Sequence, residues 1–141
     1  MKIFYPNSFT GTCFGQFYVC FRNSCFPNKQ WEDFYVNIIT YWIETICEHS
    51  NPNITDFRLD FMEADYYFLC TKNHEKVTII AIWDHKTVDV FPIETISFEV
   101  LKNTVLSAGK NILNIAKANN YCNLELSQLA NALHNAGDAS L

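Results

Sequence analysis

A helical period of apolar and polar positions runs from residue 30 to residue 49. Apolar side chains recur there every three or four residues, which predicts one helix with an aromatic face toward the interior. The inward face comprises Trp31, Phe34, Tyr35, Ile38, Trp42 and Ile46. The outward face comprises Glu32, Asp33, Asn37, Thr40, Glu44 and Glu48. Asn28 is the predicted N-cap, because its short polar side chain can accept a hydrogen bond from the first turn.

In the segment before this helix, apolar and more polar side chains alternate with a period of two residues. Residues 15–22 alternate apolar side chains with more polar ones, which predicts a strand. Residues 23–24 predict a tight turn, and residues 25–26 predict a short return strand that Pro27 ends. The sequence therefore predicts a β-hairpin beside the first helix.

Four further segments with strand character follow the helix, at residues 54–63, 66–70, 76–84 and 87–91. The first segment alternates, with apolar residues on one face and charged residues on the other. Short polar turns join the four segments, and such short connections favour antiparallel pairing because parallel neighbours need longer crossovers. These segments are therefore predicted to form an antiparallel meander.

Two helices are predicted to close the chain. Residues 98–118 keep apolar residues at helical spacing after the favourable N-cap Ser97, and residues 124–134 do so after Asn123. Together the elements predict an α+β fold, in which an antiparallel β-sheet of about five to six strands, hairpin plus meander, packs against three helices. With 141 residues and no linker-like stretch, the chain is expected to form a single domain over residues 1–141.

The composition is acidic, with 10 Lys and Arg against 15 Asp and Glu and a net charge of −5. Phosphate binding draws much of its free energy from clustered basic side chains, so this balance argues against a nucleic-acid or membrane partner. No apolar run reaches the length of a signal peptide or a membrane span, and a cytoplasmic location is expected. An acidic surface suits a basic protein partner instead.

Six cysteines are candidates for disulfides, metal binding or catalysis. They are Cys13, Cys20, Cys25, Cys47, Cys70 and Cys122. In a chain without an export signal, reduced and mostly buried thiols are expected. The Cys and His residues lack the paired spacing of a zinc site, so no metal and no other cofactor is expected. Cys13, in the stretch TGTCFG, is the candidate nucleophile with the most suitable surroundings, although a small buried hydrophobe is the favoured interpretation.

Acidic residues concentrate in the predicted meander, with eight between Ile54 and Glu94 against four basic residues. Paired carboxylates can act as acid and base, but carboxylates on the solvent face of a sheet are common, so no catalytic residue is predicted. The same carboxylates generate a field that favours a basic partner. The predicted partner-binding residues are Asp56, Asp60, Glu63, Asp65, Asp84 and Asp89.

The order of elements and several short motifs resemble small immunity proteins of bacterial contact-dependent growth inhibition and related polymorphic toxin systems. The motifs are FP at residues 26–27, W-x-D-F at residues 31–34, YW at residues 41–42, ISF at residues 96–98 and the asparagine-capped last helix. The resemblance spans nearly the whole chain as a pattern of spacing. It implies tight binding to one cognate toxin domain, basic and expected to be a nuclease, that a neighbouring gene encodes. It also implies toxin inhibition in the cytoplasm without catalytic residues.

Two other classes of function stay open at this point. One is a small enzyme or ligand-binding domain with a site near Cys13, which an activated thiol would favour. The other is an adaptor or structural subunit, which would share the physics of a binding module and differ only in its partner.

Overall fold

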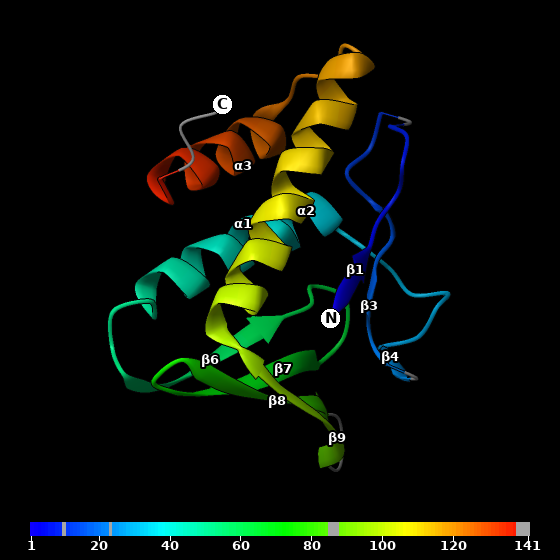
Figure 1. The fold of residues 1–141 in the computed structure, drawn as a ribbon. Coiled ribbons are helices and arrows are strands. Elements are labelled where there is room, and N and C mark those ends of the chain that lie inside the picture. Colours follow the sequence, from blue (N-terminus) through cyan, green and yellow to red (C-terminus); the bar gives the residue numbers. More distant parts are fainter. Residues whose placement is uncertain (10, 23, 85–87, 138–141) are drawn as a thin grey trace.

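The computed structural model describes residues 1–9, 11–22, 24–84 and 88–137, with the backbone alone for residues 88–93. Within these ranges the chain forms nine strands and three helices (Figure 1). The strands are β1 (Lys2–Phe4), β2 (Gly15–Gln16), β3 (Tyr18–Phe21), β4 (Ser24–Phe26), β5 (Glu32–Asp33), β6 (Ile54–Asp60), β7 (Tyr66–Asn73), β8 (Lys76–Asp84) and β9 (Val88–Ser97). The helices are α1 (Tyr35–Glu48), α2 (Phe98–Ala118) and α3 (Leu124–Asn135).

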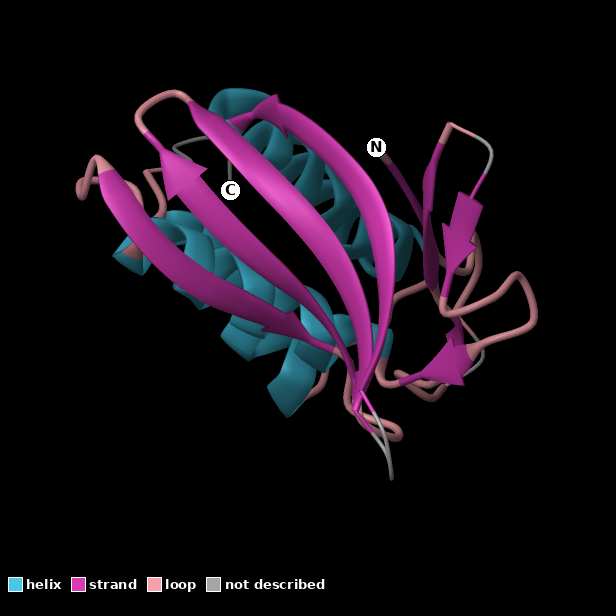
Figure 2. Ribbon diagram, turned by 90° about the horizontal axis from the view of Figure 1, so that it is seen from below, coloured by secondary structure: helices cyan, strands magenta, loops and turns pink. Residues whose placement is uncertain are grey.

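The largest sheet is an antiparallel meander with the strand order β6–β7–β8–β9. In the view from below, the helices lie behind this sheet, on one of its two faces (Figure 2). The period of two in β6 explains the arrangement, because Phe57 and Leu59 are buried while Asp56, Arg58 and Asp60 are exposed. The predicted α+β class and the antiparallel meander are confirmed.

The N-terminal strands form two small sheets beside the meander. β3 lies between β1 and β4 in one of them, and β2 pairs with β5 in the other. The predicted hairpin is present as β3 and β4, and its inward side chains Phe17, Val19 and Phe21 are buried. The strands outnumber those foreseen from the sequence, because two- and three-residue pairings are too short to show a period.

The first helix begins at Tyr35 rather than near residue 30, so the predicted start was wrong. Residues 32–33 are instead extended and pair with β2. Phe34 takes the N-cap position without a side-chain cap. The predicted N-cap, Asn28, lies outside the helix, where its Oδ1 accepts a hydrogen bond from the backbone N–H of Gln30 at 2.9 Å. The helical spacing of apolar residues therefore extends on the N-terminal side of α1 into a segment that is extended and paired with another strand.

The exposure of the side chains also shows that some residues were assigned to the wrong face of the predicted helix. Asp33 and Thr40, both predicted outside, are buried, and Phe34, predicted inside, is exposed. Thr40 tolerates burial because its hydroxyl donates to the carbonyl of Val36 at 2.8 Å. The outward positions that the structure confirms include Glu32, Glu44 and Glu48.

The two later helices begin where their caps predicted. The side chains of Ser97 and Asn123 each accept a hydrogen bond from a backbone N–H of the first turn. Gly109, in the middle of α2, faces both other helices. A Cβ at this position would lie 3.1 Å from Ile43 and 3.3 Å from Leu129. Glycine here therefore permits the close packing of three helices.

Trp42 lies at the centre of an aromatic core between α1 and the meander. Its ring centroid is 5.6 Å from those of Phe17 and Phe61 and 5.9 Å from that of Phe68. Its indole N–H donates to the backbone carbonyl of Asp60 at 2.8 Å. The indole therefore joins the helix, the N-terminal hairpin and the end of β6 in one buried contact.

We expect Trp42→Ala to lower the free energy of unfolding by about 3–5 kcal/mol, because the substitution leaves a large cavity in the core. Its neighbour Tyr41 is 54% exposed. Tyr41→Ala is therefore the matched control, with an expected change within about 0.5 kcal/mol. Chemical denaturation measures both values, and equal losses for the two variants would contradict the described burial.

Candidate interaction surface

Four of the six predicted binding residues gather at one end of the meander. β6 ends at Asp60, the following turn carries Glu63 and Asp65, and β8 ends at Asp84. The backbone N–H of Asp84 donates to the carbonyl of Asp65 at 2.9 Å, which holds the end of β8 beside the β6–β7 turn. All four side chains are exposed. We call this group of four carboxylates the acidic end.

The other two predicted residues do not belong to this group. Asp56 is exposed, but it lies opposite Thr71 and about 13 Å from Asp60 at the rise of an extended strand. The backbone of Asp89 pairs with that of Trp83 near the acidic end, while its side chain lies outside the described residues. The fold thus brings four of the six predicted residues together. Asp56 lies apart from them, and the side chain of Asp89 is not among the described residues.

Arg58 partly offsets the charge of one member of the acidic end. Its Nη2 lies 3.0 Å from a carboxylate oxygen of Asp60, and both side chains are largely exposed. The guanidinium also lies over the ring of Tyr67, 3.6 Å from the centroid. An exposed pair contributes little stability, but it reduces the local negative charge. Glu63, Asp65 and Asp84 are therefore the stronger candidates for contact with a basic partner.

A buried carboxylate holds the turn of the acidic end in place. Asp33 has 0% exposure, and its carboxylate accepts hydrogen bonds from four N–H groups. Two come from its own segment, the indole of Trp31 at 3.0 Å and the backbone of Phe34 at 2.8 Å. Two come from the β6–β7 turn, the backbones of Met62 and Glu63 at 3.1 Å each. Because a buried carboxylate is costly unless hydrogen-bonded, this arrangement fixes the turn relative to the N-terminal sheets.

Sequence reasoning missed Asp33, because the helical period assigned it to the exposed face. A signal was nonetheless present in the sequence. Aspartate is unfavourable inside a helix and common just before one, because its side chain bonds to nearby backbone N–H groups. The stretch from Trp31 to Phe34 could therefore have indicated the approach to the helix rather than its first turn.

Cys13, the candidate nucleophile, lies in surroundings that suppress thiolate formation. It is half-buried, and burial raises its pKa above that of a free thiol, an effect to which the nearby Glu125 carboxylate adds. The amide of Asn123 donates to its Sγ at 3.3 Å and opposes this shift in part. Burial also raises the pKa of the neighbouring Tyr35 phenol to about 12. Cys13 is thus a protonated thiol at neutral pH, as the buried-hydrophobe interpretation expects.

A second buried charge closes the opposite end of the meander. Lys72 has 4% exposure, and its ammonium donates to the carbonyls of His49, Ser50 and Pro52 at 3.0, 2.7 and 2.7 Å. The ammonium also lies 4.3 Å from the centroid of the Phe98 ring. All three donors of the ammonium are thus used on the backbone that links α1 to β6. Lys72 acts as a structural anchor.

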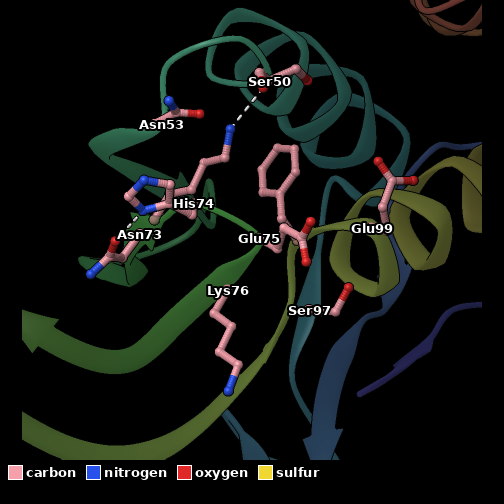
Figure 3. A pocket seen from close by; sticks show the side chains of 10 residues that line it. Ser50, Asn53, Asn73, His74, Glu75, Lys76, Ser97 and Glu99 are labelled. Atoms are coloured by element: carbon pink, nitrogen blue, oxygen red, sulfur yellow. Dashed lines mark hydrogen bonds between the residues drawn. The ribbon is translucent and has the colours of Figure 1, made fainter.

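A surface pocket of about 810 Å³ lies beside Lys72 (Figure 3). The β7–β8 turn supplies His74 and Glu75 to its lining, β8 supplies Lys76, and the N-cap and first turn of α2 supply Ser97 and Glu99. Acidic and basic side chains face the same space, so the lining does not favour a ligand of either charge. The hydroxyl of Ser97 is engaged in capping α2.

Cys20 and Cys25 form a disulfide, which corrects the expectation that all six thiols are reduced. The two residues lie directly opposite each other in the β3–β4 ladder, and such pairs bring their Cβ atoms within reach of a bridge. The free cysteines among the described residues are Cys13 and Cys47, both half-buried, the buried Cys70 and the exposed Cys122. The described residues contain no group of three or more His, Cys, Asp or Glu side chains that could hold a metal ion.

No family model, no curated protein and no solved structure matches this chain. None of the helices in the described ranges combines membrane-spanning length with sufficient apolar character.

Replacing the buried carboxylate is expected to destabilise the protein. Asp33→Asn leaves buried N–H donors facing an amide group that cannot accept from all of them, at a cost of about 2 kcal/mol or more in the free energy of unfolding. Glu32→Gln changes an exposed neighbour in the same chemical way and is expected to stay within about 0.5 kcal/mol. Denaturation gives both values. Amide hydrogen exchange should accelerate at Met62 and Glu63 only in Asp33→Asn, and unchanged exchange there would contradict the anchoring role.

Alkylation by iodoacetamide separates the two interpretations of Cys13. At neutral pH we expect Cys13 to react at least about tenfold more slowly than the exposed Cys122, because little of its thiol is ionised and access is restricted. Its rate should rise as the pH approaches its raised pKa. Peptide mass spectrometry measures both rates, and the unfolded chain, in which they should be equal, is the control. Preferential labelling of Cys13 would support the enzyme interpretation.

Proposed function

We propose that this chain is an immunity protein that binds and neutralises a cognate toxin of a contact-dependent growth inhibition or related polymorphic toxin system, with the acidic end as its toxin-binding surface. The observation that supports this most is the gathering of four exposed carboxylates at one end of a sheet whose turn is held by Asp33. A preformed surface loses little conformational entropy on binding. Carboxylates that point to solvent speed encounter with a basic partner and penalise acidic ones.

A nuclease is the toxin class that this charge pattern fits best. An enzyme that binds a phosphate backbone needs clustered basic side chains, which neutralise phosphates and release counterions. The same basic surface complements the acidic end, so an inhibitor that binds there can cover the substrate-binding site. On this proposal the protein needs no cofactor and no catalytic residue of its own, and its action is occlusion.

Neutralisation in the cytoplasm is part of the proposal, since the inhibitor must meet the toxin where the toxin reaches its substrate. Reducing conditions there would open the Cys20–Cys25 disulfide. The hairpin has other support, because β3 also pairs with β1 and its side chains Val19 and Phe21 are buried. The proposed surface therefore does not depend on the disulfide.

The two alternatives have less support. The raised pKa of Cys13 gives an enzyme no activated thiol at that position. An adaptor or structural subunit would use the same acidic end with a different basic partner. What distinguishes the immunity protein is protection of a living cell from its partner.

Co-expression with the product of the neighbouring gene tests the proposal. If that product is the toxin, cells should survive only when this chain is present, and the two proteins should co-purify. Glu63→Lys and Asp65→Lys should each weaken the complex about tenfold or more, mainly through slower association and with a reduced dependence on salt. Absence of both toxicity and complex would contradict the proposal.

Glu75→Lys is the matched control for these charge reversals. It makes the same change of net charge at an exposed position in the β7–β8 turn, at the end of the meander opposite the acidic end. We expect its association rate to stay within about threefold of the unmodified protein, because its separation from the acidic end exceeds a Debye length of about 8 Å. An equal loss in Glu75→Lys and Glu63→Lys would indicate a general effect of net charge instead of a local surface. Thermal unfolding confirms that each variant is folded.

A further inference from the structure

Three large apolar side chains are exposed beside the turn of the acidic end. Phe14 is 38% exposed, Phe34 is 39% exposed and Met62 is 43% exposed. Single exposed apolar residues are ordinary on protein surfaces, but a cluster rimmed by charges is typical of interaction sites. We call these three residues the apolar centre.

The fold brings the apolar centre together from three separate parts of the chain. The rings of Phe14 and Phe34 meet edge to face, with centroids 4.9 Å apart. The backbones of Phe34 and Met62 meet at the carboxylate of Asp33, to which each donates a hydrogen bond, at 2.8 and 3.1 Å. One buried group thus positions two of the exposed side chains and, through Glu63, one residue of the acidic end.

Phe34 is exposed and its polar neighbour Asp33 is buried, which is the opposite of the arrangement that hydrophobic burial alone would favour. Its polar neighbour Asp33 has 0% exposure, while the phenyl ring of Phe34 faces solvent. In the same turn, Phe61 is buried and Met62 is exposed. Because burial free energy is proportional to the apolar area removed from water, the exposed part of each side chain forgoes a share of it. A binding partner that covers both residues would recover that free energy.

We propose that Phe14, Phe34 and Met62 form the apolar centre of a docking surface whose charged rim is the acidic end together with the exposed Glu32. The occupant is a basic protein that presents an apolar recess surrounded by lysine or arginine side chains. This inference rests on the proposed function, under which the occupant is the toxin. A dry apolar centre inside a charged rim is the arrangement in which a few residues dominate binding free energy.

The charge of the rim selects this occupant over others. A second copy of this chain would place carboxylates against carboxylates, and such like-charge contacts oppose association. Anionic lipid headgroups and nucleic-acid phosphates are repelled for the same reason. Met62 adds an adaptable contact, because a methionine side chain fits irregular surfaces with little strain.

Apolar and charged residues of one surface should affect different steps of binding. Phe34→Ala and Met62→Ala should each weaken binding to the co-purified toxin about tenfold or more, almost entirely through faster dissociation. Glu63→Lys should act mainly through slower association. Val100 is 48% exposed near the opposite end of the meander, so Val100→Ala is the apolar control and should bind within about twofold of the unmodified protein.

Stopped-flow kinetics and calorimetry on the purified complex measure these effects, and thermal unfolding of each free variant verifies its fold. If the complex forms and both apolar variants bind like the unmodified protein, the apolar centre is refuted while the proposed function stands. If the unmodified chain forms no complex and gives no protection, both proposals fall. Sedimentation of the free protein as a dimer that Phe34→Ala converts to a monomer would refute the basic occupant in favour of a second copy.

Discussion

The carboxylate of Asp33 is the interaction on which the arrangement of this protein depends. It is fully buried, and four N–H groups from two distant parts of the chain satisfy it. A buried charge without such partners would cost several kcal/mol, so the N-terminal segment and the β6–β7 turn have to meet at this point. That meeting determines where α1 begins, and it places Phe34, Met62 and Glu63 on one surface.

The parts of the fold that were predictable from sequence are those set by local patterns. β8, α2 and the caps Ser97 and Asn123 occur where alternation, helical spacing and capping chemistry indicated. The start of α1 was not predictable in this way, because the bonds that decide it join residues 29 and 30 positions apart. An amphipathic period indicates which side chains can share one face of a helix. It cannot indicate a long-range hydrogen bond that competes with the helix.

The candidate surface was predictable in part for the same reason. Turn positions between strands could be recognised locally, and an antiparallel meander necessarily brings alternate turns to one end, which is why four predicted carboxylates gather there. Phe14 and Phe34 could not be assigned to that surface, because helical spacing indicated burial for Phe34 and no pattern linked Phe14 to it. Lys72 fell in the turn predicted between segments 66–70 and 76–84, although its alternation with Phe68 and Cys70 continues the buried face of β7.

The two buried charges explain why the ends of the meander differ. At one end the ammonium of Lys72 donates to backbone carbonyls between α1 and β6. It holds that connection against the sheet and is not available to a partner at the surface. At the other end two of the four N–H groups that bond to Asp33 come from the backbone of the β6–β7 turn, which leaves the side chains of Met62 and Glu63 free to face solvent. Backbone groups, together with the indole N–H of Trp31 at Asp33, satisfy both charges, so neither charge neutralises a charged side chain at the surface. The carboxylates of the acidic end therefore stay available to a basic partner, while the buried Asp33 fixes the position of the turn that carries them.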